Sequence, residues 1–364
     1  MRQLKIGIIG CGNISAIYLE NLRTFEETEV IAVADLDPDK AAKRAAEYGI
    51  AYACTPEELL VLPDIELVIN LTIPQAHAIV CRQALEAGKH VYVEKPLSVT
   101  VEEGESLVQL ARSKGLLLGC APDTFLGAGI QTCLDILRSG RIGRPLSATA
   151  FMMSRGHEHW HPDPHFYYAQ GGGPLYDMGP YYLTALVQLL GPLRRVSGSA
   201  AISFPERTIT SEKHYGQTIQ VETPTHLTGT MEFQSGAIGT MIMSFDIMTP
   251  TDYPYIEIFG SEGTLRVPDP NTFGGTVQIR GIADAEWHDV DLTHAYRDNA
   301  RGIGVLDMAY AIWHERPHRA NGDTALHVLE AMFGFHQAAE QGKHYELRHT
   351  CEVPAPLPKE GIEA

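Results

Sequence analysis

A glutamate, a lysine and a proline stand together as Glu94-Lys95-Pro96, directly after the apolar segment Val91–Val93. The apolar segment is typical of a buried strand, and ligands of open α/β sheets bind where parallel strands end. Pro96 keeps Lys95 out of helical geometry and fixes the direction in which the chain leaves the strand. An ammonium group there could hold a reacting oxygen. The alternative is a surface Glu–Lys pair at the start of a loop, which contributes little energy.

A glycine-rich turn near the start of the chain predicts a dinucleotide site. The apolar segment Leu4–Ile9 runs into the sequence GCGNIS at Gly10–Ser15, and a helical pattern follows. This is G-x-G-x-x-S between a strand and a helix, the context that the dinucleotide fingerprint requires. Gly10 permits a tight turn, and Gly12 lets the backbone approach a pyrophosphate at the helix N-terminus. Ser15 stands where glycine or alanine is usual and still permits close packing.

A carboxylate follows the next apolar segment. Asp35 comes after Val30–Ala34, about twenty residues beyond the glycine loop, where an acidic residue accepts hydrogen bonds from the adenosine ribose. Leu36 follows, and no Arg or Ser stands beside it to hold a 2′-phosphate, so NAD(H) is favoured over NADP(H). NADP(H) stays the less favoured alternative because the next predicted helix carries Lys40, Lys43 and Arg44. The alternative interpretation of Asp35 is an ordinary turn residue.

Apolar segments and helical patterns alternate through the first ~120 residues, which predicts a doubly wound parallel sheet. The predicted strand ends that share one edge of this sheet carry Gly10, Asp35, Pro74, His77, Glu94 and Lys95. The pyrophosphate and ribose would lie by the first two strands, so the nicotinamide must lie towards the later strands and near Lys95. His77 opens a predicted helix, where capping or packing explains it as well as a cofactor contact does.

The second part of the chain predicts a different α/β domain. Ala121-Pro122-Asp123 marks the boundary, which gives a Rossmann domain of residues 1–122 and a substrate-binding and oligomerisation domain of residues 123–364. Residues 196–279 are strand-like with glycine-containing turns. They predict a large, mainly antiparallel open sheet faced by helices.

A histidine-rich loop covers residues 155–165 and has no clear period. Three of its histidines, His157, His159 and His161, alternate along the chain and could ligate zinc, but their spacing fits no common structural site. Aromatic and imidazole groups suit hydrogen bonds to hydroxyls and stacking on a sugar ring. A sugar-binding or structural loop is therefore favoured, and no metal is predicted.

A glycine-rich segment at residues 171–182 leads into an apolar helix that ends at Leu190. If the helix runs through this segment, Asp177 and Tyr181 lie four residues apart and share a face. Pro180 opposes that arrangement, because a proline inside a helix clashes with the preceding turn. Pro180 would otherwise stand in the first turn, with Asp177 just before the helix.

Composition excludes several classes of function. The 364 residues are too many for one compact core, so two domains are expected. A net charge of -17 argues against binding nucleic acid or an anionic membrane. Six scattered cysteines favour a reduced, cytoplasmic setting. We expect neither a membrane helix nor a signal peptide, because no apolar run reaches ~18 residues and glycines interrupt the first segment.

These segments resemble the glucose–fructose oxidoreductase, inositol dehydrogenase and rhizopine-catabolism (Gfo/Idh/MocA) family over the whole chain. The resemblance is carried by the glycine loop, by Pro74–His77, by Ala87–His90 running into Glu94-Lys95-Pro96, by Gly171–Tyr182 and by Phe259–Thr264. It implies an NAD(P)-dependent enzyme that acts on a hydroxyl or ketone of a sugar, polyol or glycoside. It also implies that the open sheet mediates a homodimer or homotetramer.

The resemblance assigns roles to particular residues. It implies that Lys95 works at the reacting hydroxyl, that the Lys95–Pro96 bond is cis, and that Asp177 is the family's aspartate. Tyr181 stands where many members have a catalytic histidine, although some members similarly use a tyrosine with the lysine. Gln75 and Ile73 replace the commoner Asn and Thr near the nicotinamide.

The candidate site residues follow. Cofactor contacts are expected at Gly10, Cys11, Gly12, Asn13, Ile14, Asp35, Leu36, Thr72, Ile73, Pro74, His77, Glu94 and Lys95. Substrate contacts are expected at Lys95, Asp123, Arg155, His157, Trp160, Asp177 and Tyr181.

The mechanistic hypothesis makes Tyr181 the acid/base. A free phenol titrates near pH ~10, and a nearby ammonium such as Lys95 favours the phenolate. Asp177 would orient the sugar, while Lys95 itself or a histidine of the loop stays open as the proton carrier. Three other functions also stay open: a glycosidase-like enzyme that uses bound NAD transiently, a non-catalytic NAD-binding regulator and, least favoured, a scaffold protein.

Overall fold

The protein folds as two compact units in the computed structural model, which describes residues 2–362. The first unit comprises residues 2–127, 294–329 and 354–362, and the second comprises residues 128–293 and 330–353. By its contacts the first unit therefore extends past residue 122 and takes in two later segments that the sequence placed in the second domain. One of these segments, residues 294–329, contains a helix at Ile303–His314 that packs with the first sheet.

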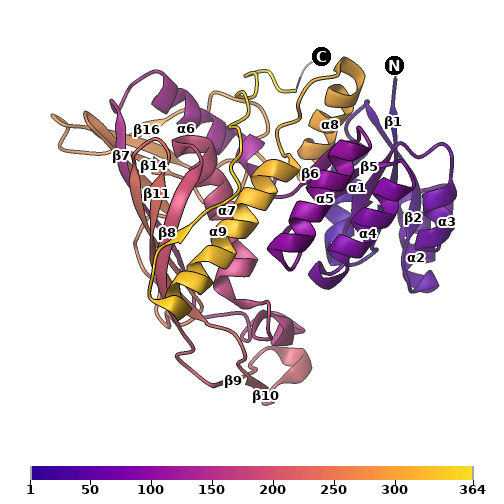
Figure 1. Ribbon diagram of the computed structural model, residues 1–364, viewed down its shortest axis with the longest axis horizontal. Coiled ribbons are helices and arrows are strands. Elements are labelled where there is room, and N and C mark those ends of the chain that lie inside the picture. The colour runs from indigo at the N-terminus through magenta and orange to yellow at the C-terminus, as the bar shows by residue number, and fades with distance from the viewer. Residues whose placement is uncertain (1, 363–364) are drawn as a thin grey trace. The chain divides into compact units, whose positions relative to one another are not determined.

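The first unit is built on a six-stranded sheet in the order β3-β2-β1-β4-β5-β6 (Figure 1). All neighbouring strands run parallel, which confirms the predicted doubly wound sheet. The strands are β1 (Leu4–Ile9), β2 (Thr28–Ala34), β3 (Tyr52–Cys54), β4 (Leu67–Asn70), β5 (His90–Val93) and β6 (Leu118–Cys120).

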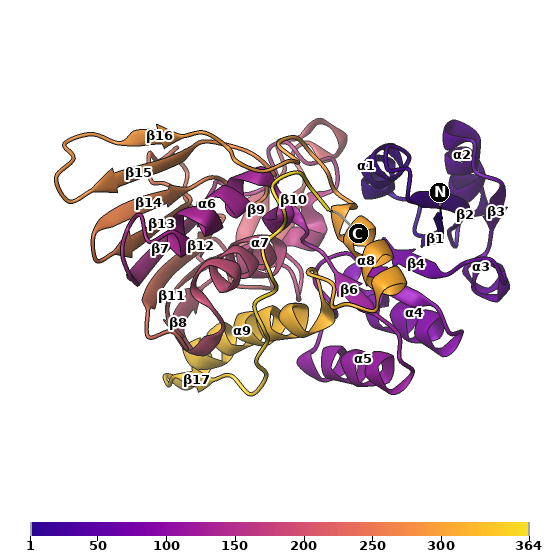
Figure 2. The same ribbon diagram turned by 90° about the horizontal axis from the view of Figure 1, so that it is seen from above.

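Helices cover both faces of this sheet, with α1 and α2 on one face and α4 and α5 on the other (Figure 2). The helices that follow the strands are α1 (Asn13–Leu22), α2 (Pro38–Tyr48), α3 (Pro56–Val61), α4 (Pro74–Glu86) and α5 (Val101–Ser113). Their ends follow local sequence signals. Thr55 and Thr100 form capping boxes at the starts of α3 and α5. Gly49 ends α2 in the left-handed conformation, with φ 69°.

Helix α8 (Ile303–His314) belongs to the first unit although it lies far along the chain. The buried Asp123 carboxylate follows β6 and accepts hydrogen bonds from the backbone amides of Gly302 and Gly304, at 2.9 and 3.0 Å. A Cβ atom at Gly304 would come within 2.8 Å of the Tyr92 ring, so glycine lets α8 approach β5 closely. The helix start is therefore fixed by a carboxylate, as helix N-termini prefer.

The second unit contains a nine-stranded sheet in the order β16-β15-β14-β13-β7-β12-β11-β8-β17. Its neighbours pair antiparallel except β7 and β12, which are parallel, so the prediction of a large, mainly antiparallel sheet is confirmed. The strands are β7 (Pro145–Met153), β8 (Leu193–Ala201), β11 (His226–Phe233), β12 (Ile238–Ser244), β13 (Ile256–Gly260), β14 (Gly263–Val267), β15 (Val277–Gly281), β16 (His288–Val290) and β17 (Tyr345–Glu346). A separate hairpin pairs β9 (Glu206–Thr208) with β10 (Thr218–Gln220).

Helices pack on one face of the nine-stranded sheet (Figure 2). They are α6 (Ala128–Arg138), α7 (Gly173–Leu190) and α9 (Gly322–Gln341), of which α9 passes from the first unit into the second. Pro180 lies inside α7, so this helix runs through the glycine-rich segment and the first of the two predicted alternatives holds. No helix of residues 2–362 is long and apolar enough to cross a membrane.

A buried carboxylate ties α9 to the segment after β17. Glu330 is fully buried and accepts hydrogen bonds from the backbone amides of Arg348 and His349, at 3.1 and 2.8 Å, and from the Tyr345 hydroxyl at 3.0 Å. Burial alone would raise the pKa of Glu330, but these donors hold it below its ordinary value. The stabilisation is therefore complete above the pKa of an unfolded glutamate, ~4.3, and is lost as the pH falls below it.

We expect Glu330→Gln to lower the free energy of unfolding at pH 7 by about 2 kcal/mol, because the amide loses charge-assisted hydrogen bonds. The exposed Glu346→Gln should change it by less than ~0.5 kcal/mol. Denaturant unfolding between pH 7 and pH 3.5 measures both variants against the unmodified protein. The deficit of Glu330→Gln should shrink below pH ~4.3, and a deficit that stays constant with pH would contradict this account.

Candidate functional site

The carboxyl ends of the parallel strands meet at one edge of the first sheet. The backbone ladder continues one residue past the strands there. The Gly10 amide donates to the Ala34 carbonyl at 2.8 Å, and the Glu94 amide donates to the Asn70 carbonyl at 3.0 Å. The turns that follow β1, β2, β4 and β5 are therefore neighbours, as the sequence predicts.

The glycine loop has the shape of a phosphate-binding turn. Gly10 has φ +104°, and a Cβ atom there would lie 2.6 Å from the backbone of Leu71, so no other residue fits. Gly12 precedes α1, and within the described residues nothing lies within 4 Å of the Cβ position. The first turn of α1 is thus open on the side from which an anion approaches a helix N-terminus.

Asp35 is anchored beside this loop. One of its carboxylate oxygens accepts from the Cys11 amide at 2.8 Å, and the other accepts from the Asp37 amide at 2.9 Å. Each oxygen keeps a further lone pair, so the carboxylate can also accept from ribose hydroxyls. The neighbouring Leu36 side chain is 89% exposed and offers an apolar surface next to the carboxylate. These residues fit the adenosine half of a dinucleotide.

Arg44 reaches the glycine loop from α2, a contact that the sequence did not predict. Its guanidinium donates to the Ser15 hydroxyl at 3.0 Å and to the Gly12 carbonyl at 3.2 Å. The Ser15 hydroxyl in turn donates to the same carbonyl at 2.6 Å. The unusual serine in the fingerprint was the available signal, because a hydroxyl at that position can accept from a nearby donor.

The Glu94 carboxylate holds the turn that carries Lys95. It accepts from the Tyr18 hydroxyl at 2.8 Å and from the Lys95 backbone amide at 2.9 Å. Burial and the adjacent Glu94 raise the pKa of Tyr18 well above its ordinary value, so the phenol remains a donor. The Lys95–Pro96 peptide bond is cis, which confirms what the resemblance implied. Lys95 is half-buried, and the Glu94 carboxylate holds its backbone amide.

His77 joins two of the turns at this edge. Its Nδ1 lies 2.6 Å from the Pro96 carbonyl oxygen, and its Nε2 lies 3.2 Å from that of Thr72. Burial lowers the pKa of His77, although both carbonyl oxygens favour a proton on the ring. The His77 side chain therefore links the turn at Thr72 to the turn at Pro96. A cofactor contact by His77 stays a prediction. Ile73 is 65% exposed, and Pro74 opens α4.

In the second unit, Asp177 and Tyr181 lie one helical turn apart on α7. The Nε2 atom of His157 is 3.3 Å from the Asp177 carboxylate. The structure therefore brings two predicted substrate residues together from the loop and from the helix. Tyr182 is a packing residue, since its hydroxyl donates to the Phe151 carbonyl at 3.3 Å and burial raises its pKa.

Among the other predicted substrate residues of the second unit, Trp160 lies next to this pair, with its ring centroid 5.4 Å from that of His157. Arg155 and Trp160 are exposed on the loop. Asp123 is buried at the start of α8, and those contacts favour a structural role for it. The residues that the structure describes include no group of three or more His, Cys, Asp or Glu side chains arranged to hold a metal.

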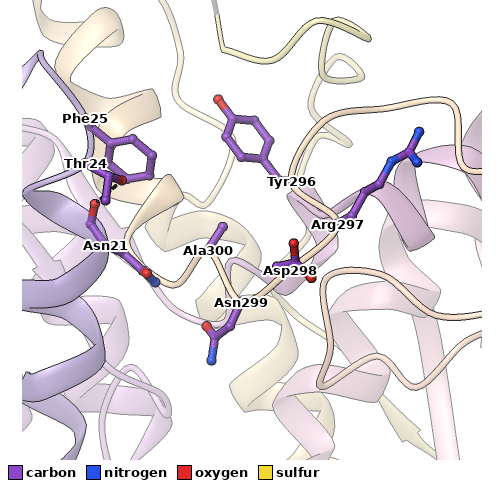
Figure 3. Close-up of a pocket in the computed structure, with 8 residues that line it drawn as sticks. All are labelled: Asn21, Thr24, Phe25, Tyr296, Arg297, Asp298, Asn299 and Ala300. Atoms are coloured by element: carbon purple, nitrogen blue, oxygen red, sulfur yellow. Dashed lines mark hydrogen bonds between the residues drawn. The ribbon is translucent and has the colours of Figure 1, made fainter.

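A pocket in the first unit lies away from the glycine loop, at the C-terminal end of α1 (Figure 3). Its lining residues are Asn21, Thr24, Phe25, Tyr296, Arg297, Asp298, Asn299 and Ala300. None of the predicted site residues lines it. In the loop that lines it, Tyr296 has φ 61°. The side-chain amide of Asn21 donates to the Arg301 carbonyl at 2.9 Å and so holds this loop against α1.

Comparison with known families matches both parts of the chain. Residues 4–121 match the family described as "Oxidoreductase family, NAD-binding Rossmann fold". Residues 130–266 match the "GFO/IDH/MocA C-terminal domain". The two matches lie on either side of the predicted domain boundary.

Individual relatives and solved structures are similar over different shares of the chain. The chain is 37% identical over 204 residues to dTDP-3,4-didehydro-2,6-dideoxy-alpha-D-glucose 3-reductase of Saccharopolyspora spinosa, covering 55% of this chain and 60% of that enzyme. It is 24% identical to myo-inositol 2-dehydrogenase of Thermotoga maritima, over 72% of this chain and 74% of that enzyme. The fold is similar to an NAD binding oxidoreductase from Klebsiella pneumoniae, with a TM-score of 0.83 and 22% identity over 94% of this chain and 98% of that chain.

The Arg44 contacts generate a prediction about the cofactor. Arg44→Met removes two hydrogen bonds that fix the glycine loop, and we expect it to raise the Kd for NADH about tenfold. Lys43→Met is the matched control, because it removes the same charge from an exposed position of α2. Titration of NADH fluorescence measures both. An equal effect of the two variants would show that only the charge of the helix matters.

Proposed function

The chain belongs to the Gfo/Idh/MocA family of NAD-binding oxidoreductases, and from this premise we propose that it interconverts a hydroxyl and a ketone on a sugar, polyol or glycoside. The observation that carries the proposal is the turn at Glu94–Pro96. The Glu94 carboxylate accepts hydrogen bonds from the Tyr18 hydroxyl and from the Lys95 backbone amide, and so fixes the backbone of a lysine at the edge of the sheet. Relatives named as sugar and inositol oxidoreductases support the substrate class.

The residues of the first unit fit NAD(H). Gly10 and Gly12 leave room for a pyrophosphate, and Asp35 offers its carboxylate to ribose hydroxyls. We favour NAD(H) over NADP(H) because Asp35 would repel a 2′-phosphate and because Arg44 is turned towards the glycine loop. When bound, the nicotinamide supplies or accepts the hydride.

The chain must supply a group that takes the hydroxyl proton while hydride leaves carbon. We assign that role to the buried Tyr181. A free phenol titrates near pH ~10, too high for efficient base catalysis at neutral pH, and an ammonium such as that of Lys95 favours the phenolate. Lys95 also holds the reacting oxygen. Asp177, one turn before Tyr181 on α7, accepts hydrogen bonds from the substrate's hydroxyls.

His157 is the alternative proton carrier. Its Nε2 faces the Asp177 carboxylate at 3.3 Å, so an Asp–His pair forms between the loop and α7. In many members of the family the histidine instead follows the aspartate on the helix, and here Tyr181 occupies that position.

We infer two further properties from family membership. The protein assembles as a homodimer or homotetramer through its nine-stranded sheet, and it works in the cytoplasm on a small carbohydrate. The net charge of -17 opposes binding of nucleic acid, which fits an enzyme of small-molecule metabolism.

Substitutions at Lys95 and Tyr181 test the assignment. We expect Lys95→Met to lower kcat/KM by ~10²–10⁴, and Tyr181→Phe to lower kcat by a similar factor, because a proton carrier contributes that much. Tyr182→Phe is the matched control for Tyr181→Phe and should change the rate little. Absorbance of NADH, with a panel of sugars, polyols and glycosides and with NAD⁺ and NADP⁺ in parallel, measures all three.

The same experiment separates the alternatives. If Tyr181→Phe keeps nearly full activity while Lys95→Met is inactive, the proton moves through Lys95 or His157, and His157→Asn decides between them. If the unmodified protein reduces neither cofactor with any member of the panel, the proposed dehydrogenase function is rejected.

A further inference from the structure

A group of aromatic rings extends from the Asp177 carboxylate to the protein surface. Its members, which we call the aromatic platform, are His157, Trp160, His161, Phe166 and Tyr167. Ring centroids lie 3.9 Å apart for His157 and Tyr167, 4.0 Å for Phe166 and Tyr167, and 5.4 Å for His157 and Trp160. The platform is therefore a continuous cluster of tilted and edge-to-face rings.

The platform is buried at one end and open at the other. His157 packs against the buried Phe245 ring at 4.7 Å and contacts Asp177 through Nε2. Trp160 and Phe166 form the outer end and are 57% and 56% exposed. Two large exposed aromatic side chains on one short loop leave apolar surface in water that nothing in the described chain covers.

A buried charge network holds the loop under these rings. Glu158 accepts a hydrogen bond from the Tyr168 hydroxyl and pairs with Arg207 at 2.7 Å. Arg207 also binds the Asp246 carboxylate and donates to the Arg155 carbonyl at 3.2 Å. All of these side chains except Arg155 are largely buried, so the pairs keep a fixed geometry and the exposed rings stand on a rigid base.

The position of the open end suggests a ligand. The Trp160 ring centroid lies 5.4 Å from that of His157, the imidazole that contacts Asp177. A sugar whose hydroxyls meet Asp177 would therefore place a ring joined to it over Trp160. Flat apolar faces of sugars and aromatic rings stack on indole and phenyl side chains. The imidazoles of His157 and His161 lie among the rings, and the Nδ1 atom of His161 accepts a hydrogen bond from the Asp163 backbone amide at 3.0 Å, which leaves its Nε2–H as a donor.

We propose that the aromatic platform is a subsite for a second ring, and that the substrate is a glycoside rather than a free monosaccharide. The inference rests on the proposed function and narrows its substrate class. The reacting ring binds at Asp177, and the ring attached to it stacks on Trp160 and Phe166. That second ring is another sugar or an aromatic aglycone, since both present a flat apolar face of similar size.

The test compares substrates with one ring and with two. For the sugar that the protein oxidises, NADH formation is measured with the methyl glycoside, the disaccharide, the 4-nitrophenyl glycoside and, where the sugar is glucose, dTDP-glucose. We expect kcat/KM for a two-ring substrate to exceed that for the methyl glycoside about tenfold, the size of one good stacking interaction. In Trp160→Ala the ratio of the two kcat/KM values should fall close to one, and in Trp160→Phe it should stay near that of the unmodified protein.

Controls distinguish stacking from general damage. Tyr215→Ala removes another exposed aromatic ring of the second unit, 75% exposed and outside the platform, and should leave both rates unchanged. Indole fluorescence of the NADH complex should be quenched by a two-ring glycoside in the unmodified protein and much less in Trp160→Phe. This binding signal does not depend on turnover.

Several outcomes overturn the proposal. The unmodified protein could oxidise the methyl glycoside and the two-ring substrates equally, or Trp160→Ala could lower both rates by the same factor. Trp160→Ala could instead shift the protein to a smaller species in size-exclusion chromatography, which would make the platform a contact between copies of the chain. No oxidation of any substrate rejects the proposed function, whereas oxidation without a two-ring preference rejects only the platform.

Discussion

The fixed backbone at Lys95 depends on the hydrogen bonds of one carboxylate. Glu94 accepts from the Tyr18 hydroxyl and from the Lys95 backbone amide, and both donors lie inside the first unit. A buried carboxylate without such donors would be costly. The glutamate therefore fixes the backbone from which the lysine side chain extends.

The second unit reaches its arrangement in another way. In the first unit, strand ends and backbone amides set the positions of the groups, whereas here side chains from a loop meet a helix. The continuation of α7 through Pro180 puts Asp177 and Tyr181 on one face, and the loop brings His157 to Asp177. The buried Arg207 pairs with Glu158 and Asp246 and so holds the loop in one arrangement. A movement of the loop that separated these groups would leave a buried charge unpaired, which is costly.

The sequence predicts what local signals determine. The glycine loop and the alternation of strands and helices in the first ~120 residues depend on neighbours within a few residues, and both are found in the structure. The pairing of His157 with Asp177 and the reach of Arg44 to Ser15 depend on packing between distant segments, which periodicity does not encode. The return of α8 to the first sheet is of the same kind, since 179 residues separate Asp123 from Gly302.

The two units differ in where their candidate binding groups come from, and this difference bears on which residues determine the substrate. A fold places a cofactor, but the groups that recognise a particular substrate lie on loops that vary without disturbing the sheet. The edge of the first sheet offers backbone atoms, two glycines and one aspartate, which suit any dinucleotide of the same kind. The loop at residues 155–168 offers an imidazole, exposed rings and a rigid charged base, and none of these is required by the nine-stranded sheet. Substrate identity is therefore expected to follow this loop, while the cofactor follows the glycine turn.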